Sequence, residues 1–271
     1  MRYRAKKFFA VVKNLIFVPT CASCGERLSP IPEKGNMTYD KVCFCKSCAE
    51  KWEMAKTEMC PVCFNVSGKC TCTPDFFFKY QPEIPSICFY HPDSQDVQSK
   101  AIISMKRRCD TELFEFMAID LYPRLNSTLV KMGISGEDCI FTWVPRKASS
   151  INESGFDQGK QLSDSLAKLF KAKSYPIFLR IGGKEQKKLD KTGRRANAKR
   201  SIKLNSSLSG FPLWIKEKNI EEFLGGKNVV IIDDVLTSGS TLRQAVELAK
   251  SAKAKNTVVA CIAKTYLKGD K

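Results

Sequence analysis

Two adjacent carboxylates, Asp233 and Asp234, follow an uninterrupted apolar run and precede a turn of small hydroxylated residues. The run, Val229 to Ile232, is rich in β-branched residues and predicts a strand that is buried on both faces of a parallel sheet. After the turn, apolar residues at helical spacing predict a helix that begins near Leu242. The turn between strand and helix consists of Thr237, Ser238, Gly239, Ser240 and Thr241.

This order of strand, carboxylates, turn and helix predicts a ribose 5-phosphate site. Ligands of open α/β sheets bind beyond the carboxyl ends of the strands. A turn that enters a helix offers a phosphate its backbone N–H groups and the positive end of the helix dipole. The carboxylates suit sugar hydroxyls, or water on a magnesium ion. The alternative is an ordinary buried strand followed by a capped helix, and the structural context of the motif favours the site.

The chain is strongly basic, with 45 Lys and Arg residues against 28 Asp and Glu residues and a formal net charge of +17. Such a charge favours a polyanionic partner. A solvated basic surface without a partner explains the composition equally well. The length of 271 residues suits one large domain or two smaller ones. The sequence contains no run of about 18 apolar residues, so we predict no membrane span.

Nine of the 13 cysteines lie between Cys21 and Cys72, and several form Cys-x-x-Cys pairs. This pattern predicts thiolate metal ligation in a reducing compartment rather than a secreted disulfide framework. We expect one or two structural zinc ions. Pairing in order assigns Cys21, Cys24, Cys45 and Cys48 to one zinc and Cys60, Cys63, Cys70 and Cys72 to a second. Cys43 can substitute for Cys45, and an interleaved pairing stays open.

Four segments follow from these patterns. Residues 1–18 predict an amphipathic helix, with contact to a membrane surface as the weaker alternative. Residues 19–75 predict a zinc-ribbon module with little core of its own, folded mainly by its metal. Residues 76–135 predict a linker followed by the N-terminal strand and helices of the main domain, with Phe76, Phe77 and Phe78 docked on that domain or stacked on bases. Residues 136–271 predict the main α/β domain.

Two further features of the main domain bear on its site. Arg146 and Lys147 follow a predicted strand, Cys139 to Val144, so both cations should face the crevice that contains Asp233. After another predicted strand, Tyr175 to Leu179, a basic stretch between Ile181 and Arg200 shows little apolar periodicity and predicts a mobile loop. Its candidate DNA contacts are Lys184, Lys187, Lys188, Arg194 and Arg195.

The stretch from Val229 to Thr241 resembles the phosphoribosyl pyrophosphate (PRPP) signature of type I phosphoribosyltransferases. Together with the cysteine-rich region and the segments Val144-Pro-Arg-Lys147 and Gly155-Phe-Asp-Gln158, it makes nearly the whole chain resemble the ComF family of bacterial DNA-uptake proteins. Ser154 stands where that family usually has arginine, which removes one possible anion contact. Asp157 replaces the usual asparagine.

The resemblance implies a type I phosphoribosyltransferase-like parallel sheet flanked by helices, with an N-terminal cysteine-rich zinc-ribbon module. It implies that Asp233 and Asp234 meet the ribose and magnesium. Residues Thr237 to Thr241 would hold the 5-phosphate, and Arg146 and Lys147 would lie near the pyrophosphate.

The resemblance also implies a cytoplasmic competence protein that handles single-stranded DNA during natural transformation. Its partners would be single-stranded DNA, PRPP with Mg2+, and a DNA-uptake helicase. The alternative function is a phosphoribosyltransferase of nucleotide or nucleobase metabolism, whose acceptor the sequence does not identify. A third interpretation is a zinc-stabilised scaffold with a vestigial pocket, against which the intact Asp-Asp and Thr-Ser-Gly-Ser-Thr weigh.

Overall fold

A five-stranded parallel sheet forms the centre of the molecule, as seen in a computed structural model that describes residues 18–28, 43–181 and 201–265. The strand order is β1–β7–β6–β2–β3, so the two longest strands, β6 and β7, lie near the middle. The strands are β1 (Cys88–Phe89), β2 (Cys139–Trp143), β3 (Lys173–Ser174), β6 (Asn228–Leu236) and β7 (Asn256–Lys264).

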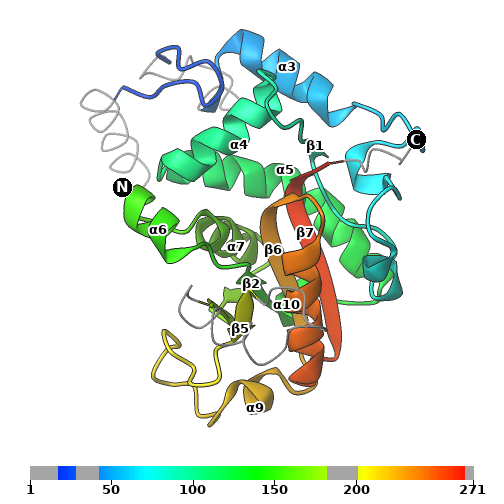
Figure 1. The fold of residues 1–271 in the computed structure, drawn as a ribbon, viewed down its shortest axis with the longest axis vertical. Helices are drawn as coiled ribbons and strands as arrows, with labels where there is room; N and C mark the ends of the chain where they lie inside the picture. The colour runs from blue at the N-terminus through cyan, green and yellow to red at the C-terminus, as the bar shows by residue number, and fades with distance from the viewer. Residues whose placement is uncertain (1–17, 29–42, 182–200, 266–271) are drawn as a thin grey trace, which may run out of the picture.

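Helices cover both faces of this sheet (Figure 1). Helices α5 and α7 pack on each other and against one face, and α10 packs against β6 and β7 on the other face. The helices are α3 (Lys46–Lys56), α4 (Val97–Arg107), α5 (Thr111–Lys131), α6 (Ala148–Ser154), α7 (Gln158–Leu169), α9 (Ile220–Leu224) and α10 (Ser240–Ser251), with 3-10 turns η1 (Ser67–Lys69), η2 (Asp75–Lys79) and η3 (Gly136–Asp138). The arrangement confirms the expected parallel sheet flanked by helices.

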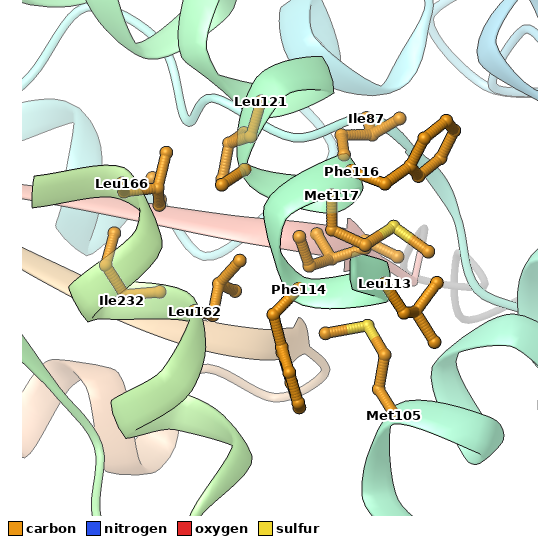
Figure 2. Close-up of a cluster of buried hydrophobic side chains, with 14 of the residues drawn as sticks. Ile87, Met105, Leu113, Phe114, Phe116, Met117, Leu121, Leu162, Leu166 and Ile232 are labelled. Carbon is orange, nitrogen blue, oxygen red and sulfur yellow. The ribbon is translucent and has the colours of Figure 1, made fainter. Parts of the chain in front are cut away.

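Alternate side chains of the central strands enter the two layers. Val230 and Ile232 pack with α5 and α7, whereas Val229 and Ile231 pack with α10. Figure 2 shows Ile232 facing Leu162 and Leu166 of α7 in the first of these layers. Because successive side chains of a strand point to opposite faces, a run that is apolar at every position can be buried on both. The apolar run before the carboxylates therefore forms the centre of the sheet.

The expected strand from Tyr175 to Leu179 is wrong in its extent. Two short strands replace it: β3 ends at Ser174, and β4 (Phe178–Arg180) pairs antiparallel with β5 (Ile202–Leu204) in a separate two-stranded sheet. Pro176 lies between them and has no backbone N–H to donate. The amide of Tyr175 still donates to Phe141 O at 2.9 Å, after which the chain leaves the main sheet.

The cysteine-rich region packs on the main domain more than its polar composition suggests. Phe44 and Trp52 are each 1% exposed, and both rings contact Phe116 of α5. Trp52 Nε1 also donates to Asp120 Oδ2 at 2.6 Å. The cysteine-rich region therefore shares its aromatic core with α5.

Two predicted segments lie largely or wholly outside the described residues. They are the N-terminal amphipathic helix and the basic loop that carries Lys184, Lys187, Lys188, Arg194 and Arg195. Within the described ranges, no helix has both the length and the apolar character needed to cross a bilayer.

Candidate functional site

The two carboxylates lie near the C-terminal end of β6, at the edge where the parallel strands end. Asp233 aligns with Cys261 of β7, and the preceding Ile232 aligns with Trp143 of β2. Both aspartates are half-buried. Burial, and then the negative charge of Asp234, hold the pKa of Asp233 well above its ordinary value. A cation at this edge would therefore favour the ionised carboxylate.

Asp234 has partners from two other elements. Lys106 Nζ, in the last turn of α4, lies 3.1 Å from Asp234 Oδ2. Gln158 Nε2, at the start of α7, donates to the same oxygen at 3.2 Å. Lys106 is the first of three consecutive cations in the sequence, and nothing in the sequence indicates that it reaches the sheet edge.

The turn of small residues follows β6 and leads into α10. Its central residue, Gly239, has φ +71°, a left-handed conformation that side-chain-bearing residues adopt only with strain. A Cβ on Gly239 would lie 2.8 Å from Phe77 Cε2, so the turn passes directly against that ring. The start of α10 supplies backbone N–H groups without an intrahelical partner and the positive end of the helix dipole. The turn thus combines small residues with a helix N-terminus of the kind that suits an anion.

One open cavity is formed by this turn. Its lining consists of Asp233, Val235, Leu236, Thr237, Ser238, Gly239, Ser240, Thr241 and Leu242. The structure therefore brings together one predicted carboxylate and all five predicted turn residues. The lining offers hydroxyl groups and backbone amides at one end and a carboxylate at the other.

The segment after β2 is fixed by Asp157. Its Oδ2 accepts hydrogen bonds from Trp143 Nε1 and from the backbone N–H of Arg146, both at 3.2 Å, while its Oδ1 caps α7 through Gly159 N at 2.9 Å. The Arg146 guanidinium donates to Ser154 Oγ at 3.0 Å and to Lys106 O at 3.3 Å. Arg146 is thus attached to the helix end that contacts Asp234. Lys147 is exposed and precedes α6.

The eight predicted cysteine ligands form two separate groups in the order of the sequence. Within each group all sulfur atoms lie within 4.8 Å of one another: Cys21, Cys24, Cys45 and Cys48 in the first, and Cys60, Cys63, Cys70 and Cys72 in the second. Tetrahedral zinc with Zn–S distances of about 2.3 Å separates its sulfurs by roughly 3.8 Å. Cys24 Sγ and Cys45 Sγ are 3.7 Å apart. The thiol sets therefore fit zinc, and each group could hold one ion.

The local structure of these groups differs from a pure ribbon. Cys21 and Cys24 lie in a turn closed by the bridge between Thr20 and Arg27, and Met59 and Val66 close the turn of Cys60 and Cys63 in the same way. Cys45 and Cys48 instead lie at the start of α3. The second Cys-x-x-Cys pair of the first group therefore lies at a helix N-terminus.

Burial raises the pKa of Cys70 to about 12 and that of Cys72 to about 11. At Cys63, burial is outweighed by backbone hydrogen bonds at Asn65 and Thr71, which lower its pKa to about 5. Because a metal ligand must be a thiolate, metal binding to the second group has to displace protons from its less acidic members.

Lys264 joins the second cysteine group to the sheet. It is the last residue of β7, is fully buried, and its Nζ donates to Cys70 O at 2.9 Å. Burial lowers the pKa of Lys264, and the nearby thiols of Cys261 and Cys70 oppose that shift. A buried ammonium next to four thiol ligands offsets part of the negative charge that ionised thiols would bring. The sequence pattern alone does not indicate this contact.

Replacing Gly239 by alanine should destabilise the protein more than the same change at Gly226. Both glycines have nearly equal positive φ, +71° and +74°, but only at Gly239 does an added Cβ meet another atom, Phe77 Cε2. Left-handed strain costs roughly 1–2 kcal/mol at either position, and overpacking against the ring adds about 1–3 kcal/mol at Gly239. Urea denaturation measures the free energy of unfolding of both variants. Equal losses of that free energy would show that the turn does not depend on its contact with the Phe77 ring.

Residues 182–269 match the family model described as a phosphoribosyl transferase domain. No curated protein sequence matches the chain. The matched range contains β6, the turn after it, α10 and β7.

Solved structures similar to the chain have low sequence identity. They include a phosphoribosylpyrophosphate synthetase from Mycobacterium smegmatis (13% identity, TM-score 0.31, covering 54% of this chain and 33% of that one). A hypoxanthine phosphoribosyltransferase from Staphylococcus aureus shows 13% identity and a TM-score of 0.33, covering 64% and 73%. A glutamine PRPP amidotransferase from B. subtilis shows 14% identity and a TM-score of 0.31, covering 73% and 32%. The chain thus spans about a third of the length of the synthetase and of the amidotransferase. The family match and the sheet together give this chain a type I phosphoribosyltransferase fold.

Proposed function

We propose that the cavity at the end of β6 binds PRPP together with Mg2+. The observation that carries this proposal is the single cavity lined by Asp233 and by the whole turn from Thr237 to Thr241. The turn and the start of α10 suit the 5-phosphate, because both supply hydrogen-bond donors to an anion. The carboxylates suit the ribose hydroxyls and the magnesium ion. Arg146 and Lys147 would serve the diphosphate.

Asp233 and Asp234 give the most direct test. The double change Asp233→Asn and Asp234→Asn keeps the side-chain size but removes both charges, so we expect calorimetric binding of Mg2+ and PRPP to be lost. The Gln158 contact to position 234 can persist with the amide, and a thermal melt should confirm the fold. A double variant that binds PRPP as tightly as the parent would show that the pocket is assigned wrongly.

The second candidate function is that of a phosphoribosyltransferase. The products recovered after the calorimetric titration with Mg2+ and PRPP distinguish it from a protein that only binds PRPP. In phosphoribosyl transfer the bond between ribose C1 and the diphosphate breaks and a nucleophilic acceptor bonds to C1; a Mg2+ ion held by the carboxylates would supply positive charge for the departing diphosphate. The paired carboxylates beside the phosphate turn favour this candidate. Release of pyrophosphate would establish transfer or hydrolysis, whereas intact PRPP recovered from the complex would indicate binding alone.

Both cysteine groups hold structural zinc in this proposal. The support is the grouping of the sulfur atoms and the 3.7 Å separation of Cys24 from Cys45. We expect atomic emission to find two zinc ions per chain, with one ion lost in Cys24→Ser and one in Cys72→Ser. A full zinc complement in either variant would contradict the grouping.

The wider role we propose is that of a ComF-type competence protein, handling incoming single-stranded DNA in the cytoplasm with a DNA-uptake helicase as partner. The resemblance of nearly the whole chain supports this role, and so does its net charge of +17. A basic surface binds single strands without sequence preference because phosphate contacts release counterions. Cysteines ligated as thiolates suit a reducing compartment.

Changing the five basic loop residues to alanine tests the DNA proposal. They are Lys184, Lys187, Lys188, Arg194 and Arg195. At about 0.7 per phosphate contact, their loss should reduce the slope of log K against log salt by up to about 3.5. Fluorescence anisotropy with a labelled single-stranded oligonucleotide measures the slope.

The matched control removes the same charge from exposed lysines elsewhere. It changes Lys46, Lys51, Lys79, Lys216 and Lys255 to alanine. We expect this control to keep most of the slope of the parent. Binding that is independent of salt, or no binding of the parent at low salt, would exclude the DNA role.

A further inference from the structure

Lys106 belongs to a part of the chain that the family match does not cover, yet it contacts Asp234, the neighbour of the carboxylate that lines the cavity. The match spans residues 182–269, whereas Lys106 lies in the last turn of α4. Its Nζ is 3.1 Å from Asp234 Oδ2. The Lys106 side chain is 35% exposed and that of Asp234 is 13% exposed. The ammonium thus contacts a mostly buried carboxylate and keeps an accessible side.

Lys106 differs in this respect from the cations that follow it. Arg107 is exposed, and Arg108 donates from Nη1 to Thr20 Oγ1 at 2.6 Å, toward the cysteine-rich region. A helix dipole favours cations at the C-terminal end of α4 in general, so the dipole does not explain why one of the three turns to the sheet edge. The contact with Asp234 explains that direction.

Arg146 brings a second cation to the same place from a different element. Its guanidinium donates to the backbone carbonyl of Lys106 at 3.3 Å. The end of α4 and the segment after β2 are therefore joined beside Asp234. Two cations held this way by separate elements form a site for a group with more negative charge than one phosphate monoester.

Gln158 provides an independent sign of a ligand beside Asp234. The side chain is only 7% exposed, and its Nε2 donates to Asp234 Oδ2. Its buried Oε1 accepts no hydrogen bond within the described part of the chain. Buried acceptors are nearly always satisfied, so an unpartnered one points to an O–H supplied by a ligand or by ligand-bound water.

The two ends of PRPP can be assigned from this arrangement, given the pocket proposed above. The 5-phosphate and the diphosphate lie at opposite ends of the ribose, and the turn from Thr237 to Thr241 takes the 5-phosphate. We propose that Lys106 binds the diphosphate and makes the pocket select PRPP over ribose 5-phosphate. Asp234 holds the ammonium in place while the exposed side of Lys106 faces the ligand.

Lys106→Met tests this role, because methionine keeps much of the length of lysine and removes the charge. Calorimetry on the full chain with Mg2+ measures the affinities for PRPP and for ribose 5-phosphate. We expect PRPP to bind at least tenfold more weakly and ribose 5-phosphate to bind within twofold of the parent. Unchanged binding of ribose 5-phosphate also shows that the variant is folded. Lys106→Arg should keep most of the selectivity.

Arg107→Met is the matched control, since it removes one charge from the same helical turn at an exposed side chain. It should leave both affinities unchanged. Equal losses of both ligands in Lys106→Met, or no loss of either, would overturn the role of Lys106 while the pocket stands. A parent protein that binds neither ligand would instead refute the PRPP pocket, and the role of Lys106 with it.

Discussion

The parallel register of β2, β6 and β7 is the constraint on which the candidate site depends. Backbone hydrogen bonds continue past the end of β2, where Val144 N donates to Ile232 O at 3.0 Å. Because all three strands run in the same direction, the residues that follow β2 and those that follow the apolar part of β6 emerge at one edge. Arg146, Asp234 and the turn before α10 are brought to that edge by backbone pairing. The helices bury the apolar strands, and α4 and α7 add Lys106 and Gln158 beside Asp234.

The second cysteine group is part of the N-terminal module and also contacts the carboxyl edge of the sheet. Lys264 reaches Cys70 from the end of β7, and its strand partner in the register is Leu236, the residue before the turn from Thr237 to Thr241. Phe77 lies a few residues beyond Cys72 and forms the wall against which Gly239 packs. The turn is therefore supported from one side by α10 and from the other by the chain that leaves the cysteine group. A metal that rigidifies the cysteines would also hold the wall of the turn.

Much of this site could be predicted from the sequence, because its central part is local. An apolar run, two carboxylates, a turn of small residues and a helical repeat are consecutive, and cysteine pairs close in sequence group in order when their spacing suits a metal. Contacts between distant segments could not be predicted in this way. Lys106 and Asp234 meet only because α4 ends beside β6, and Phe77 reaches Gly239 only through the path taken after Cys72. Pro176 shows the same limit, because strand propensity around it indicated one strand where the missing N–H gives two.

Hydrogen-exchange mass spectrometry of the zinc-loaded protein, with and without PRPP and Mg2+, tests the central claim that PRPP binds at the carboxyl edge of β6. The structure predicts slower amide exchange in residues 236–243, where the turn enters α10, and in residues 144–147 after β2. Exchange in α9, at the far end of the main domain in Figure 1, should not change. Protection confined to other segments, or no protection in residues 236–243 at saturating PRPP, would contradict the account.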